Sequence, residues 1–86
     1  MAKGYTNEEL QKLVAYADSK IAENPNDYDA YALRALTYTR LGNTKEAEAD
    51  LAKIKQLRPD SEDIKDLDAI LILTKAKAII RETRQS

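Results

Sequence analysis

Few residues in this sequence are suited to chemistry, and most of those are carboxylates. Histidine and cysteine are both absent, which removes imidazole bases, thiol nucleophiles, disulfides and the usual zinc ligands. Asp60, Glu62, Asp63 and Asp66 gather just after Pro59. Their spacing lacks the glycine and the twelve-residue frame of a calcium-binding loop. We therefore expect no metal site.

The other routes to catalysis are equally thin. A phosphate-binding loop needs closely spaced glycines, and the chain has only Gly4 and Gly42. Ser61 stands before a helical stretch, where its hydroxyl is best used as an N-terminal cap. A nucleophile with its base, two opposed carboxylates and a metal centre are all missing. The sequence therefore predicts a protein that is not an enzyme and needs no cofactor.

Length and charge narrow the class of protein further. The 86 residues make one domain, 1–86. Fourteen basic and 15 acidic residues leave a net charge of −1, so we expect no nucleic-acid partner.

The longest apolar run, Ala69 to Leu73, is far shorter than the ~20 residues that span a bilayer. The N-terminal segment is no signal peptide, and we expect a cytoplasmic protein without a membrane partner.

Proline and glycine divide the chain into four helical stretches. Pro25 and Pro59 close two of them, and Gly42 suits the left-handed end of another. Between these marks, apolar residues recur three or four positions apart, as on one face of a helix. The helices are predicted over residues 6–23, 27–41, 44–57 and 60–83.

Capping residues support three of these starts. Thr6 followed by Glu9 predicts a capping box. The second helix has Asn26 or Asp27 as its predicted cap, and the fourth has Asp60 or Ser61.

A weak internal repeat has a period of 34 residues. Pro25 and Pro59 are separated by this distance, and residues of similar character follow each. The segment Tyr28–Pro59 resembles a complete tetratricopeptide motif, with the family's spacing at Tyr31, Ala35, Tyr38, Gly42, Ala47, Leu51, Ile54 and Pro59. Ile54 departs from the pattern because it is larger than the usual alanine or serine. We expect it to push the two helices slightly apart or to contact the fourth helix.

The resemblance implies an all-α fold of antiparallel helical hairpins. About four helices would form a fragment of a right-handed superhelix, with an extended C-terminal capping helix. The first helix resembles the second half of a preceding motif, and the fourth resembles the first half of a following one.

The resemblance also implies a protein–protein interaction module, because the inner helices of this family line a groove for a partner segment. By position, the groove consists of Asp29, Leu33, Leu36, Arg40, Asp66, Leu67, Ile70, Leu73 and Thr74. Ala32, Leu33 and Leu36 stand where a carboxylate clamp would have polar side chains. A clamp-type chaperone adaptor is therefore not expected. Alternatively, neighbouring helices simply cover Leu33 and Leu36.

The fourth helix has two apolar stripes on different sides. The first, expected to pack on the domain, is Ile64, Leu67, Leu71 and Ala78. The second, here called the outer stripe, is Ala69, Ile72, Leu73, Ala76, Ile79 and Ile80. A helix that is apolar on two sides needs two partners. The outer stripe has three possible partners: the first helix, a second copy of the chain in a homodimer, or a different protein.

Three interpretations of function remain open at this level. The chain is an interaction module that binds a partner protein or itself. Alternatively, it is a structural subunit of a homo-oligomer or larger assembly, or an engineered repeat scaffold with no natural ligand.

Overall fold

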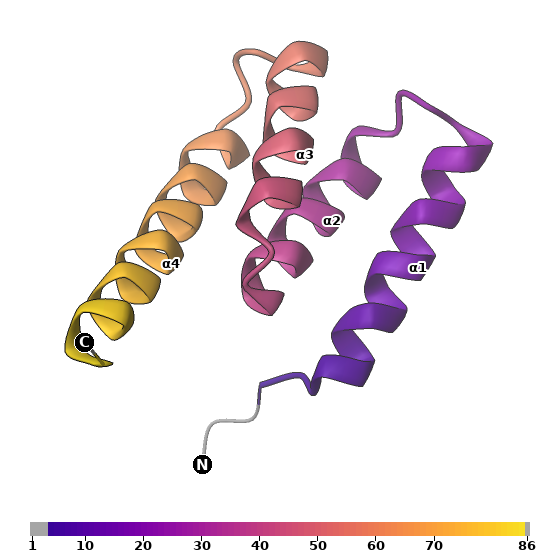
Figure 1. Ribbon diagram of the computed structural model, residues 1–86. Helices are drawn as coiled ribbons and strands as arrows, with labels where there is room; N and C mark the ends of the chain where they lie inside the picture. The colour runs from indigo at the N-terminus through magenta and orange to yellow at the C-terminus, as the bar shows by residue number, and fades with distance from the viewer. Residues whose placement is uncertain (1–3, 86) are drawn as a thin grey trace.

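Four helices make up the described part of the chain. The computed structural model describes residues 4–85, apart from the side chains of Asp63, Ala78 and residues 81–85. The helices are α1 (Asn7–Glu23), α2 (Tyr28–Leu41), α3 (Thr44–Leu57) and α4 (Asp63–Gln85), arranged in chain order across the molecule (Figure 1). No strand occurs in residues 4–85, so the predicted all-α fold is confirmed. None of the described helices is long and apolar enough to cross a membrane.

The caps of α1 and α2 form as the sequence predicts. The Thr6 hydroxyl accepts from the Glu9 N–H at 3.1 Å, and the Glu9 carboxylate accepts from the Thr6 N–H at 2.8 Å. Asp27 caps α2 by accepting from the Ala30 N–H at 3.2 Å. Gly42 ends α2 with φ of 84°, a left-handed conformation in which glycine has no steric penalty.

The predicted start of α4 at residue 60 is wrong, because the helix begins at Asp63. After Pro59 the chain makes a turn in which the Ser61 N–H donates to the Arg58 carbonyl at 3.2 Å. This turn places the Ser61 hydroxyl 2.6 Å from the hydroxyl of Tyr28, with which it forms a hydrogen bond. Tyr28 is buried, and a buried hydroxyl needs such a partner. A long-range contact therefore accompanies the delayed start of α4.

The main core lies between α2, α3 and α4. Its buried members are Tyr28, Ala47, Leu51, Ile54, Ile64 and Leu71. Ile54 has no exposed surface and shares this cluster with Ile64 and Leu71 of α4. The residue that departs from the family pattern thus helps to join α3 to α4, one of the two outcomes expected for it.

Helix contacts place α2 and α4 beside each other. Each helix packs on its neighbours in the chain, and α2 also packs on α4. Leu10 and Ala17 of α1 are buried, and among the described residues α1 packs on no helix other than α2. The possibility that α1 covers the outer stripe of α4 is therefore wrong.

Candidate partner-binding surfaces

An apolar hollow of about 310 Å³ lies between α2 and α4. Ala32, Leu33 and Leu36 line it from α2, and Asp66, Leu67 and Ile70 line it from α4. The two triplets occupy the same positions of the 34-residue repeat. Each presents positions i, i+1 and i+4 of a helix, which fall on one face. The repeat therefore builds one continuous apolar surface from two helices that are distant in sequence.

The leucines of this hollow are partly open to solvent. Leu33, Leu36 and Leu67 are half-buried, and Ile70 is 38% exposed. Neighbouring helices therefore cover Leu33 and Leu36 only in part.

Four predicted groove residues lie outside the lining of the hollow. Asp29 is exposed in the first turn of α2. Arg40 is exposed in the last turn of α2, where its guanidinium lies 5.8 Å from the centre of the Tyr5 ring. Leu73 is 60% exposed and belongs to the outer stripe. The Thr74 hydroxyl, also predicted to face the groove, donates to the Ile70 carbonyl at 2.8 Å.

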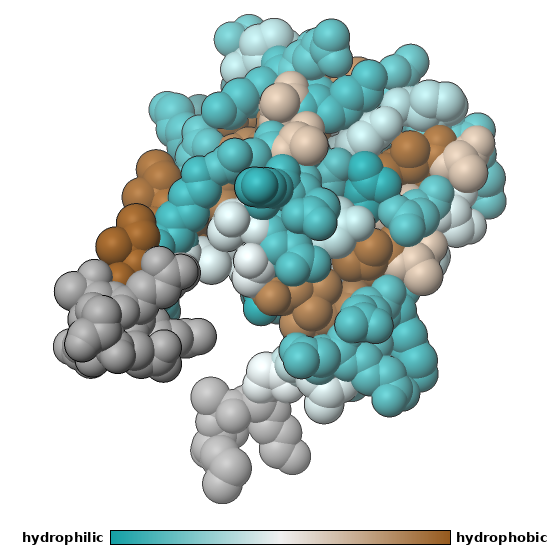
Figure 2. Space-filling model, in the orientation of Figure 1, coloured by the Kyte–Doolittle hydropathy of each residue, from teal (hydrophilic) through white to brown (hydrophobic). Residues whose placement is uncertain are grey.

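The two stripes of α4 have opposite environments. Ile64 and Leu71 of the first stripe are buried against the core, and Leu67 packs beside them; Ala78 lies outside the described side chains. The whole outer stripe is exposed, including Ile72, Leu73, Ile79 and Ile80 at 64%, 60%, 62% and 51%. Figure 2 shows hydrophobic atoms at the surface along the edge of the molecule that α4 forms.

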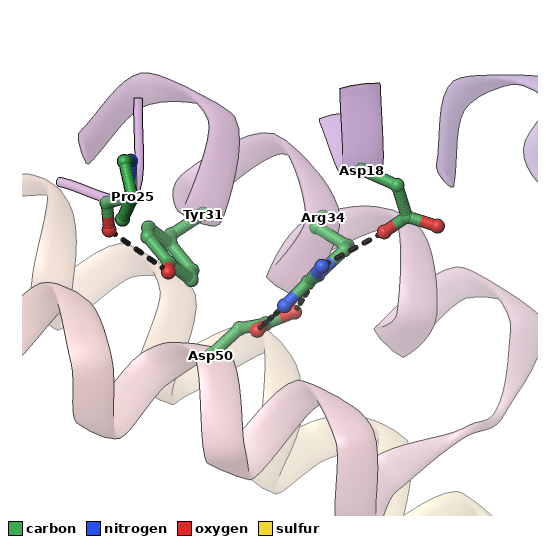
Figure 3. A network of polar contacts seen from close by, with 5 residues as sticks. All are labelled: Asp18, Pro25, Tyr31, Arg34 and Asp50. Carbon is green, nitrogen blue, oxygen red and sulfur yellow. Dashed lines mark hydrogen bonds and ion pairs between the residues drawn. The ribbon is translucent and has the colours of Figure 1, made fainter. Parts of the chain in front are cut away.

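A polar network that the sequence did not predict joins three helices (Figure 3). Arg34 of α2 donates to both carboxylate oxygens of Asp50 on α3, from Nε at 2.8 Å and Nη2 at 2.7 Å. Its Nη1 donates to Asp18 on α1 at 2.8 Å. Asp50 is buried, and the hydrogen bonds to Asp50 raise the pKa of the Arg34 guanidinium above its ordinary value, against the opposing effect of burial. The charged guanidinium thus fixes α1 and α3 on α2.

The sequence contains a spacing that is consistent with this network, but the spacing links residues that are far apart in the chain. Asp18, Arg34 and Asp50 are spaced evenly by 16 residues, and Arg34 and Asp50 are equidistant from Gly42. In an antiparallel hairpin, positions equidistant from the turn lie side by side. The pairing becomes visible only once the register of the hairpin is known.

Ion pairs also cross from α3 to α4. Lys55 pairs with Asp68 at 3.3 Å, and Lys75 pairs with Glu48. These side chains border a hollow of about 280 Å³ between the two helices. In the part of the chain that the structure describes, no group of three or more acidic residues is placed to hold a metal ion.

A curated fungal protein is similar in sequence to this chain. It is a tetratricopeptide repeat and J domain-containing co-chaperone of Fusarium oxysporum f. sp. lycopersici, 37% identical over 62 residues. The match covers 72% of this chain. The resemblance to the tetratricopeptide repeat family is confirmed. The chain spans only 11% of the length of the co-chaperone. No protein-family model matches the chain, and no solved structure matches it significantly.

The tetratricopeptide-like pattern explains the order of the helices. In that pattern, α2 and α3 correspond to the complete motif, α1 to the second helix of a preceding motif, and α4 to the first helix of a following motif. The hollow then lies between the first helices of two consecutive tetratricopeptide-like units.

Proposed function

We propose that this tetratricopeptide-like chain is a protein-binding module without catalytic activity. Its working surface is the apolar hollow between α2 and α4, which holds a segment of a partner protein. The observation that carries the proposal is the hollow itself, with its two repeat-related triplets of lining residues. The similar fungal protein is named a co-chaperone, which supports protein partners as the ligands of this chain.

The chemistry of the hollow selects the kind of segment that fits. Leu33, Leu36, Leu67 and Ile70 favour aliphatic side chains, because removing apolar surface from water favours the complex. Asp66 is the charged residue of the lining. The partner segment is therefore aliphatic and carries a lysine or arginine that reaches Asp66. A free C-terminal carboxylate is disfavoured, because the lining offers no cationic side chain.

A peptide selection tests the proposal, because it requires no identified partner. A displayed library of random peptides is selected on the wild-type chain, and the enriched peptides are measured by fluorescence polarisation. We expect aliphatic sequences with a basic residue. Leu36→Asp should weaken their binding roughly tenfold or more, because it buries a charge against an apolar ligand.

The matched control is Tyr16→Asp on α1. Tyr16 is 56% exposed and lies outside the lining of the hollow, so this variant should bind the selected peptides as the wild type does. A failure to enrich any sequence, or equal binding by Leu36→Asp and wild type, contradicts the proposed function.

A further inference from the structure

A second hollow, of about 380 Å³, lies between the first half of α1 and the end of α2. Its volume falls within the range of ~300–1,000 Å³ that is typical of ligand sites, and it shares no residue with the hollow between α2 and α4. Its lining, which gives it the name amide hollow, consists of Asn7, Gln11, Val14, Tyr38, Leu41 and Asn43. The lining contains no charged side chain, although 34% of the residues of the chain are charged.

Helical spacing and the turn after α2 bring these residues together. Asn7, Gln11 and Val14 are four and three positions apart on α1, so they lie on one face of that helix. α1 packs on α2, whose last turns supply the opposite side of the hollow. The Asn43 N–H donates to the Tyr38 carbonyl at 2.8 Å, which holds Asn43 beside the end of α2.

The amide groups of the hollow have unused capacity for hydrogen bonds. Asn7, Gln11 and Asn43 are exposed. Asn43 stands at the N-cap of α3, where an asparagine oxygen usually accepts from the first turn, but its side chain makes no capping bond. In the part of the chain that the structure describes, the side chains of Asn7 and Gln11 also make no hydrogen bond. All three amides can therefore bind a ligand without breaking a bond within the protein.

The hollow between α3 and α4 occupies the equivalent place in the repeat, but an ion pair bridges it. At the 34-residue offset, Val14 and Leu41 correspond to Glu48 and Lys75. Glu48 and Lys75 both line the hollow between α3 and α4 and pair across it. In the amide hollow, two half-buried aliphatic side chains replace this pair. The amide hollow is therefore unbridged and combines apolar side chains with free amides.

We propose that the amide hollow binds an uncharged, extended segment of a partner protein, as a second site beside the hollow of the proposed function. An aliphatic side chain of the segment packs on Val14 and Leu41, because removing apolar surface from water favours the contact. Asn7, Gln11 and Asn43 pair with the backbone of the segment, since each side-chain amide has the donors and the acceptor that a peptide group needs. A charged side chain is disfavoured, because the lining offers it no ionic partner in exchange for water.

A depleted peptide selection tests this site separately from the proposed function. Val14→Glu with Leu41→Lys copies the ion pair between α3 and α4 and should close the amide hollow. A displayed library of random peptides is first depleted on this double variant and then selected on the wild-type chain. We expect uncharged sequences with an aliphatic residue, which bind the double variant at least roughly tenfold more weakly in fluorescence polarisation. Enrichment of no sequence, or of charged sequences alone, overturns the proposal.

Single substitutions keep the test valid if the double variant fails to fold. Gln11→Glu and Asn43→Asp exchange an amide for a carboxylate of the same shape at exposed positions. Each should weaken binding of the enriched peptides roughly threefold to tenfold, because a donor is lost. The matched control is Asp66→Asn, at an exposed position in the lining of the other hollow. It should bind these peptides as the wild type does, and weaken only the basic peptides expected from the proposed function. The opposite pattern overturns the proposal.

The side-chain amide resonances report the contact directly. Titration of the ¹⁵N-labelled chain with an enriched peptide should shift the side-chain NH₂ signals of Asn7, Gln11 and Asn43. The side chain of Asn24, at the far end of α1, is the internal control and should not shift. A peptide that leaves the three signals unchanged overturns the proposal. Methyl β-glucoside, titrated in parallel, should not shift them; shifts with this sugar and with no peptide would assign the hollow to a carbohydrate instead.

Discussion

Arg34 stabilises the molecule through Asp50, whose buried carboxylate pairs with the Arg34 guanidinium. Both oxygens of Asp50 accept from the one guanidinium. The third donor reaches Asp18, whose side chain is 53% exposed. The contacts of Arg34 with Asp18 and Asp50 have similar distances, but they differ in energy. Water competes for the hydrogen bond at the exposed carboxylate of Asp18, whereas the carboxylate of Asp50 is buried.

Arg34→Ala should therefore destabilise the fold by about 3 kcal/mol, because it leaves a buried, unpaired carboxylate. Asp18→Ala removes only the more exposed partner and should cost less than about 1 kcal/mol. Urea unfolding followed by circular dichroism measures both. Equal losses in the two variants would show that the buried pair has no special role.

Tyr38 gives the fold a dependence on alkaline pH. Burial, followed by the nearby charge of Asp18, raises the pKa of the Tyr38 hydroxyl above its ordinary value of 10.0. The folded state thus favours the neutral phenol. The stabilisation is complete below the unfolded pKa, and it is lost as the pH rises through the folded pKa.

In the wild type, the free energy of unfolding should fall between about pH 9 and pH 11. Tyr38→Phe should reduce this fall, and Tyr16→Phe, at an exposed position, should leave it unchanged. Urea unfolding at the two pH values measures the difference. A fall of the same size in Tyr38→Phe would mean that other groups cause it.

At this scale, the sequence predicts local features well and paired ones poorly. The capping box at Thr6 and the left-handed Gly42 depend on residues within one or two turns, so their types are sufficient evidence. The pairing of Arg34 with Asp50 depends on the register of two helices, which no local pattern contains. The hydrogen bond between the hydroxyls of Tyr28 and Ser61 is missed for the same reason.

On α3, Ile54 departs from the tetratricopeptide pattern, and the larger side chain has a role in packing. Ile54 stands where alanine or serine is usual, and the structure places it in the core with no exposed surface. Its contacts belong to the cluster that includes α4. The extra volume therefore fills the space between two successive units.

Ile54→Ala restores the residue that the family prefers, yet it should destabilise this chain by about 2–5 kcal/mol, because it opens a cavity in the core. Ile72→Ala is the matched control, since Ile72 is 64% exposed, and should change stability by less than about 0.5 kcal/mol. Thermal and urea unfolding measure both. A neutral Ile54→Ala would mean that the neighbouring helices close the gap.

Local residues predict where three of the helices begin, whereas the start of α4 also depends on a contact with a distant residue. The starts of α1, α2 and α3 lie within a residue of the predicted positions. The start of α4 is displaced because the turn after Pro59 brings Ser61 to Tyr28. The acidic residues of that turn suggested a helix start by their type alone, and the tertiary contact shifted it.

Taken as a whole, the molecule offers two apolar surfaces that both involve α4. The hollow is shared with α2, and the outer stripe belongs to α4 alone. The sequence predicted Leu33, Leu36, Leu67 and Ile70 of the hollow, because the 34-residue offset identifies the inner helices. It also predicted the outer stripe, but not its exposure, which depends on where α1 packs. That residues 1–86 fold as a single domain stays a prediction.

The proposed function requires that the hollow between α2 and α4 holds a partner segment. Titration of the ¹⁵N-labelled chain with a selected peptide, followed by backbone amide chemical shifts, locates the bound segment on the chain. We predict that the largest shifts fall on Ala32, Leu33, Leu36, Leu67 and Ile70, and that Tyr16 on α1 and Ile79 on the outer stripe stay unchanged. Largest shifts on α1 or on the outer stripe, with none at the hollow, would contradict the account.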